Sequence, residues 1–261
     1  MPIARRAIDS LRRKDWSATG IELVVVILGV FIGLQAANWN EDRLSAQRGV
    51  GFTARLKQDL RVEAWNYEMQ IGYYQQVRAN AIRAADALSG RSVLSDEALL
   101  AAAYRATQYN ENTRQRTTYD ELISTGEMHL VADMALRKLA MEMYSLPNIE
   151  LIAEEGRFSQ YRQLFRKRIP HQVQAAVAAA CGDRVIPSGD YAGIGSALDY
   201  PCAIDVPAAD LAEAARILRE DPETLPLLRL RIADTGTNIS QFDAYLPDLR
   251  EALRRVAAEA P

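Results

Sequence analysis

Residues 21–43 read "IELVVVILGVFIGLQAANWNEDR", and this stretch decides how the chain is organised. Only two of its first roughly 17 residues are strongly polar, Glu22 and Gln35, and roughly 17 apolar residues is the lower limit for a helix that crosses a bilayer. We therefore expect a transmembrane helix over residues 21–40. It divides a leader, residues 1–20, from a much longer remainder, residues 41–261.

Two tryptophans bracket the apolar run. At about 1.5 Å per helical residue, Trp16 and Trp39 lie roughly 35 Å apart, which fits the two interfaces of a hydrocarbon core about 30 Å thick. A cleaved signal peptide is the main alternative. Against it, the charged leader is long, and no A-x-A-like cleavage site follows, because Leu34 or Gln35 stands at the −3 position. The flanks thus favour an uncleaved span.

The charges on either side of the span predict its orientation. The expected membrane-interface residues are Arg5, Arg6, Arg12, Arg13, Lys14, Trp16 and Trp39. The five cations precede the span, whereas Glu41 and Asp42 follow it, with Arg48 and Arg55 somewhat further on. The positive-inside rule places the leader in the cytoplasm and the large remainder outside. The leader is either a short amphipathic helix on the anionic leaflet or a disordered basic tail.

Small and polar residues share one face of the expected span. At about 100° per residue, a narrow arc holds Glu22, Gly29, Gly33, Ala36 and Asn40, with Val26 at its edge. Gly29 and Gly33 form a small-x-x-x-small motif, which lets two helix backbones approach closely in lipid. This face predicts a helix–helix association surface. The alternative is that glycine is simply common in spans and that Glu22 reaches the headgroups from the first turn.

Helical periodicity continues after the span. Apolar residues step by three and four from Leu56 to Leu88 without an interrupting proline, and Gly90 stands where such a helix would end. We expect one long helix, continuous with the span unless Gly49 and Gly51 break it. Further helices are predicted after Ser95, over the capping box at Thr118, after Asp133, over 148–168 and 171–180, and after Asp205, Asp221 and Pro247. No alternating strand pattern of any length occurs.

The two cysteines of the chain flank its one long irregular segment, "CGDRVIPSGDYAGIGSALDYPC", within an expected loop over 181–206. In an oxidising compartment Cys181 and Cys202 should pair with each other, and in a cytoplasmic domain they would be two free thiols. The predicted orientation favours the disulfide. The predicted architecture is therefore all-α: one N-terminal transmembrane helix, a long helix and a mostly antiparallel extracytoplasmic helical bundle.

Two segments resemble a family of uncharacterised single-span bacterial membrane proteins, classed together as a domain of unknown function. They read "LQAANWNE" (34–41) and "TYDELISTGEMHLVADMALRKL" (118–139). The first is similar to the family's membrane exit sequence, although Ala37 stands where the family tends to have Asn. The second is similar to its aromatic-x-Glu-Leu-x-Ser-Ser/Thr-Gly stretch. The resemblance covers about a quarter of the chain. It implies an inner-membrane protein with a helical extracytoplasmic body and no stated activity.

The sequence offers little material for catalysis. The net charge is −3, so nothing global suggests a nucleic-acid partner, and a mean hydropathy of −0.17 excludes several spans. There is no P-loop or nucleophile elbow, and "GIGSAL" at Gly193 lacks the preceding strand that a dinucleotide site needs. His129 and His171 stand apart from each other, and Glu154 and Glu155 point in different directions on a helix. We expect no enzyme activity, no cofactor and no metal.

Two functions remain. The first is a non-enzymatic membrane-anchored interaction or scaffold protein that self-associates through its span, for example as an accessory subunit of a larger inner-membrane complex. Its partners are then the lipid bilayer and a second copy or another membrane protein. The second is a periplasmic ligand-sensing helical bundle, which the short leader disfavours because it holds no cytoplasmic output domain. "RFSQYRQLFRKR" (157–168) is a basic stretch that could face an anionic partner or simply solvent.

Overall fold

The structure, a computed structural model, describes residues 16–111, 113–146, 148–243 and 246–259, and it is all-α over these ranges. The predicted fold class is confirmed. A long N-terminal apolar helix comes first and shorter helices follow it, with no strand in the described ranges. The chain divides into two compact units, Met1–Thr53 and Ala54–Pro261.

The first helix, α2 (Trp16–Leu88), is 73 residues long and contributes to both units. It passes through Gly49 and Gly51 without a break, so the predicted continuity with the apolar segment is confirmed. It lacks an interior proline, and Gly90 follows its end with φ 75°, a left-handed conformation that glycine adopts at little cost. The leader cations predicted at the membrane interface, Arg5 to Lys14, lie outside the described residues.

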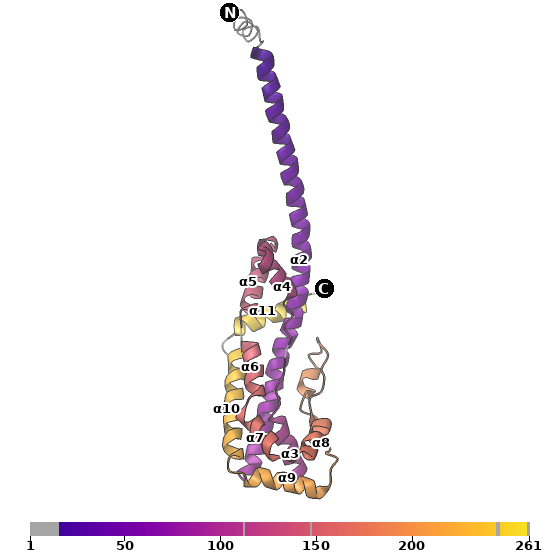
Figure 1. Ribbon diagram of the computed structural model, residues 1–261, viewed down its shortest axis with the longest axis vertical. Helices are drawn as coiled ribbons and strands as arrows, with labels where there is room; N and C mark the ends of the chain where they lie inside the picture. Colours follow the sequence, from indigo (N-terminus) through magenta and orange to yellow (C-terminus); the bar gives the residue numbers. More distant parts are fainter. Residues whose placement is uncertain (1–15, 112, 147, 244–245, 260–261) are drawn as a thin grey trace, which may run out of the picture. The chain divides into compact units, whose positions relative to one another are not determined.

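Nine α-helices and two 3-10 turns follow α2 in the described part of the 54–261 unit. They are α3 (Asp96–Arg105), α4 (Thr117–Thr125), η1 (Glu127–Leu130), α5 (Met134–Tyr144), α6 (Asn148–Arg157), α7 (Gln160–Arg168), α8 (His171–Cys181), η2 (Gly193–Ser196), α9 (Ala208–Glu220), α10 (Thr224–Asp243) and α11 (Pro247–Ala258). Within this unit α10 runs back alongside α2, while α9 and α11 cross near the two ends of α10 (Figure 1).

The core of this unit forms around the C-terminal half of α2. Its predicted apolar stripe is buried from Leu56 to Ala85, with Leu56 and Val77 fully inaccessible and Tyr67 stacked edge-on against Phe242 of α10 at 5.1 Å. Beyond it, α3 packs against α8 and α9, and α7 packs against α10. Alanines of α2 and α3 let these helices approach closely in the shared apolar cluster.

Four local predictions about where helices begin or end were wrong. The helix expected over 148–168 is two helices, because the Ser159 hydroxyl accepts the Arg162 N–H and starts a new N-terminus at α7. Thr118 is not an N-cap: α4 begins at Thr117, and the Thr118 N–H donates instead to Asp59 of α2. The starts expected at Asp205 and Asp221 fall later, at Ala208 and Thr224.

Other end signals are confirmed. The Ser95 side chain accepts the Ala98 N–H and so caps α3, and Asp133 accepts the N–H groups of Ala135 and Leu136 at the start of α5. Gly126 ends α4 in the left-handed conformation with φ 71°. The caps at Ser95 and Asp133 were thus predictable, whereas the local cap at Ser159 and the contact of Thr118 with Asp59 of α2 were not.

Candidate functional site

The N-terminal part of α2 is long and apolar enough to cross a membrane, and none of its most apolar 18-residue window is buried by the described chain. The large apolar side chains from Ile21 to Leu34 are each 52–65% exposed. Soluble proteins rarely leave so large a continuous apolar surface uncovered. This segment therefore needs a lipid bilayer or another protein around it.

The small-residue face is open as well. Apart from the adjacent backbone of its own helix, a Cβ added at Gly29 or Gly33 would meet no atom of the described chain within 4 Å. Val26, Ala36 and Asn40 on the same face are exposed, and Trp39 beyond them is 69% exposed. The helix also includes Glu22 and Trp16. The described chain therefore leaves the association surface uncovered from Val26 to Asn40.

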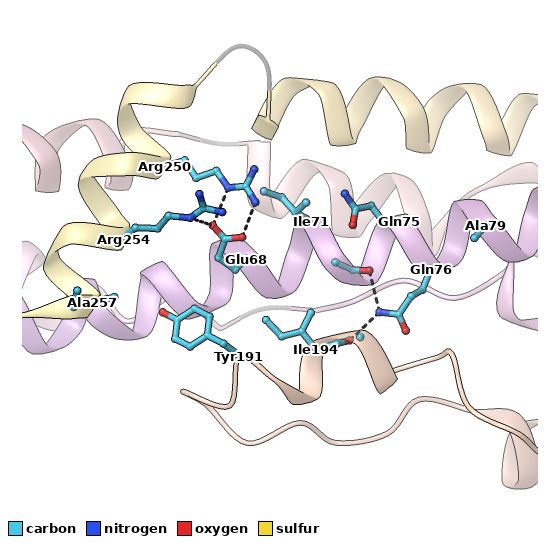
Figure 2. A pocket seen from close by; sticks show the side chains of 13 residues that line it. Glu68, Ile71, Gln75, Gln76, Ala79, Tyr191, Ile194, Arg250, Arg254 and Ala257 are labelled. Carbon is cyan, nitrogen blue, oxygen red and sulfur yellow. Dashed lines mark hydrogen bonds and ion pairs between the residues drawn. The ribbon is translucent and has the colours of Figure 1, made fainter.

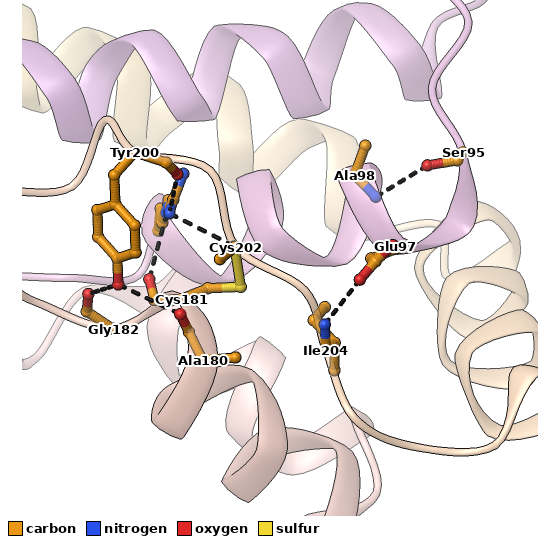
Figure 3. Close-up of a disulfide and its surroundings, with 10 residues drawn as sticks. Ser95, Glu97, Ala98, Ala180, Cys181, Gly182, Tyr200, Cys202 and Ile204 are labelled. Carbon is orange, nitrogen blue, oxygen red and sulfur yellow. Dashed lines mark hydrogen bonds between the residues drawn. A yellow bond between two sulfur atoms is a disulfide. The ribbon is translucent and has the colours of Figure 1, made fainter.

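Cys181 and Cys202 lie at disulfide distance, with their Cα atoms 5.3 Å apart (Figure 3), so the predicted pairing of the only two cysteines is confirmed. Cys181 ends α8, and the pair closes the irregular segment that contains η2. Arg105 at the end of α3 supports the closure. It is 4% exposed, and it donates to the Cys181 carbonyl at 3.2 Å and to the Tyr200 carbonyl at 2.8 Å.

Two cations lie over the Tyr200 ring beside this disulfide. The guanidinium carbon of Arg105 is 4.5 Å from the ring centroid, and that of Arg184 is 3.7 Å from it. On the other side of the closure, Glu97 of α3 accepts the Ile204 N–H at 2.7 Å. These contacts fix both ends of the irregular segment against α3, which gives an otherwise loop-like region a defined position in its unit.

The irregular segment also packs against α2 through Gln76. This side chain donates to the carbonyls of Gly72 and Ile194 at 2.9 and 2.8 Å, and its oxygen accepts the N–H groups of Leu198 and Asp199. Gly72 makes the approach possible, because a Cβ there would lie 2.4 Å from an Ile194 methyl. The packing leaves an open pocket of about 820 Å³ between α2, α11 and the η2 region (Figure 2).

Charge in this pocket is concentrated on one side. Glu68 of α2 accepts two hydrogen bonds from Arg250, at 2.8 and 2.7 Å, and one from Arg254 at 2.9 Å, both from α11. Arg250 also pairs with Asp243. Burial alone would raise the pKa of Glu68, but hydrogen bonds from Arg250 and Arg254 outweigh it and lower that pKa. The rest of the lining is largely apolar, and it includes Ile71, Ile194, Tyr191 and Ala257.

The cations of this pocket are paired. Both arginines of the pocket are held by carboxylates, and the described residues include no cluster of metal-ligating side chains. His129 contacts the Gly126 carbonyl through Nδ1, and His171 is exposed at the start of α8. The Gly193 motif forms η2 inside the disulfide-closed segment, where no strand precedes it.

The sequence did not predict that charged side chains are buried in the 54–261 unit. Glu63, Arg105, Arg114 and Arg231 are almost inaccessible, and each meets a partner far away in sequence. Arg114 lies in the polar run 110–116, which reads as a loop. A charged residue in a polar loop carries no signal that it will be buried, so tertiary contacts alone reveal it.

Comparison with family models, with curated proteins and with solved structures finds no match for this chain. The resemblance to the single-span family therefore stays a prediction, and the function has to be argued from the described surfaces.

Proposed function

We propose that this chain is a single-pass, membrane-anchored interaction or scaffold protein without catalytic activity, which associates through its span with a second copy or with another membrane protein. The observation that carries the proposal is the uncovered apolar segment of α2. Burying one large apolar side chain is favourable by roughly 1.5–3 kcal/mol, so a continuous run of them in water would be strongly unfavourable. A bilayer supplies the missing environment.

The flanking residues and the cysteines support one topology. The cations of the leader precede the apolar segment and acidic residues follow it, which favours a cytoplasmic N-terminus and a periplasmic body in a bacterial inner membrane. A pair of cysteines at disulfide distance agrees with an oxidising compartment. The body would then present its surfaces, including the 820 Å³ pocket, to periplasmic or membrane partners.

Association through the span is supported by the open glycine face. In lipid, helices gain little from hydrophobic burial against each other, and close backbone contact through small residues is a main source of affinity. Gly29 and Gly33 offer such a contact, with no side chain of the described chain in the way. A partner helix can therefore approach this face directly.

The test replaces both glycines with a branched side chain. We expect Gly29→Ile with Gly33→Ile to insert normally, because the segment becomes more apolar, and to shift the particle from the mass of a complex to that of one chain. Particle mass is measured after purification from native membranes in a mild detergent, with co-purifying proteins identified in the same preparation.

The matched control is Ile27→Leu with Phe31→Leu, which changes side-chain shape on the opposite face of the same helix and keeps it apolar. This variant should retain the wild-type mass. An unchanged particle mass in the glycine variant would rule out association through the Gly29–Gly33 surface. A homo-oligomer without other proteins would make self-assembly the function, and a stoichiometric second protein would make the chain an accessory subunit.

Ligand sensing is the second candidate function, and the open pocket beside α2 is the observation that favours it. Its volume lies within the range of small-molecule sites, roughly 300–1,000 Å³. A small molecule retained through the same native purification, and lost when Ile71 is replaced by Arg, would favour sensing over scaffolding.

A further inference from the structure

The basic stretch 157–168, which includes α7, contains two arginines that the scaffold proposal does not use. Arg157 pairs with Glu111, and Arg168 pairs with Asp221 at 2.7 Å. By contrast, Arg162 and Arg166 have no carboxylate within ion-pair distance in the described ranges. They are four residues apart, so their side chains lie on the same face of the helix. The two cations thus share a region without a counter-ion.

Both arginines line a small pocket between α7, α8 and the end of α3. Tyr104 and Thr107 contribute from the α3 side, Gln174 from α8, and Phe165 forms part of the apolar lining. The volume is about 250 Å³. This is below the roughly 300–1,000 Å³ of typical small-molecule sites, so the pocket suits a small ion or one polar group rather than a drug-sized molecule.

Arg162 is incompletely satisfied in this pocket. One terminal nitrogen donates to the Thr107 carbonyl at 3.0 Å, and the guanidinium lies over the Tyr109 ring at 4.8 Å. Its Nε is buried and has no hydrogen-bond partner in the described chain. Such a group normally finds a partner, because leaving a buried donor unpaired costs stability.

The electrostatics point the same way. Burial, and next the charge of Arg166, lower the pKa of Arg162, which means that the two guanidinium groups repel each other across the pocket. Asp183 is a nearby negative group, but its carboxylate accepts the Tyr73 hydroxyl at 2.8 Å and does not reach ion-pair distance of Arg162. An anion between the arginines would remove the repulsion.

We propose that Arg162 and Arg166 form a binding site for a phosphate group, carried by inorganic phosphate or by a small phosphomonoester. Arginine presents several N–H donors in a planar fork that matches phosphate oxygens, and these charge-assisted bonds are stronger than neutral ones. The donors are the guanidinium of Arg166 and the terminal nitrogen of Arg162 that does not bond to Thr107, since both arginines line the pocket. This inference does not depend on the function of the span.

The test is calorimetric titration of the full chain in a maltoside detergent and a phosphate-free buffer, with inorganic phosphate and with glycerol 3-phosphate. We expect Arg166→Gln to weaken binding by about tenfold or more, since it removes a charge-assisted contact. Arg166→Lys keeps the charge but not the fork and should lie in between. The Arg166 side chain is exposed, so its replacement removes no buried contact that the fold needs.

Lys167→Gln is the matched control, because it removes the same charge one residue further on, outside this pocket. It should change the affinity by less than about twofold. Equal weakening by Arg166→Gln and by Lys167→Gln would overturn the proposal in favour of a diffuse basic surface, and so would an absence of binding to the wild type at millimolar concentration. Tighter binding of glycerol 3-phosphate would identify a phosphomonoester as the ligand, and tighter binding of inorganic phosphate would identify the free ion.

Discussion

At the scale of single residues, the body is held together by buried charges that meet partners from distant parts of the chain. The carboxylate of Glu63, which is inaccessible, accepts Arg114 Nε at 2.6 Å and the Gln115 N–H at 2.7 Å. Arg114 also donates to the Met143 carbonyl at 2.8 Å. This one pair therefore ties α2, the 110–116 segment and α5 together.

Removing one partner of this ion pair should destabilise the fold. We expect Arg114→Met to lower the free energy of unfolding by about 3–5 kcal/mol, because Glu63 would keep a buried charge without a counter-ion. The measurement is urea unfolding of the full chain in detergent, followed by tryptophan fluorescence.

Lys138→Met is the control for that experiment, since Lys138 and Glu142 form an ion pair on the surface of α5 with the lysine side chain 74% exposed. It should change the same free energy by less than about 1 kcal/mol. Similar losses in the two variants would contradict the role assigned to Glu63 and Arg114. The pair Glu63→Leu with Arg114→Met should recover part of the loss, because an apolar pair leaves no unpaired charge.

At the scale of elements, α11 buries an apolar face within its unit, packs against α5 and α10, and is attached to α2 by ionic contacts. Leu249, Leu253 and Val256 are buried on one face of α11, and Glu68 of α2 holds Arg250 and Arg254 at its edge. The ionic part depends on the charge of Glu68. Because the pKa of Glu68 is lowered in the folded chain, this part stabilises the fold above the ordinary pKa of about 4.5 and is lost as the pH falls through the lowered value.

A pH series tests this attachment. We expect Glu68→Gln to lower the melting temperature at pH 7, and the difference from the wild type to shrink below about pH 4.5 as the wild-type carboxylate takes up its proton. Glu142→Gln, on the surface of α5, should give no such pH-dependent difference. A constant gap between the wild type and Glu68→Gln from about pH 7 to about pH 3 would refute the ionic attachment.

At the scale of the whole molecule, the chain joins one unit that leaves an apolar surface uncovered to another that buries its own core. The redox state of the cysteines reports where the second unit resides. In intact cells we expect Cys181 and Cys202 to resist alkylation before reduction and to take up two alkyl groups after it, as measured by mass. Modification of both thiols without reduction would place the body in a reducing compartment and contradict the proposed topology.

Much of this organisation could be predicted from the sequence. Apolar spacing alone gives α2 and its buried stripe, because every turn of a long uninterrupted helix repeats the same signal. The pairing of the two cysteines follows from their number together with the predicted extracytoplasmic orientation. The basic stretch 157–168 is visible in the sequence, but the two pockets could not be predicted, since Glu68 meets Arg250 across 182 residues and Arg162 meets Thr107 across 55. Pairings at such separations depend on how the helices pack.

The disulfide has a consequence for engineering. Because Cys181 and Cys202 join the chain across the irregular segment, a single backbone break between them would leave the protein one covalent molecule. The stretch from Pro187 to Asp190 is exposed and lies before the residues that pack on Gln76. A reporter peptide or a protease recognition sequence inserted there would lie in a loop closed by the disulfide, and the helices on both sides would keep their positions.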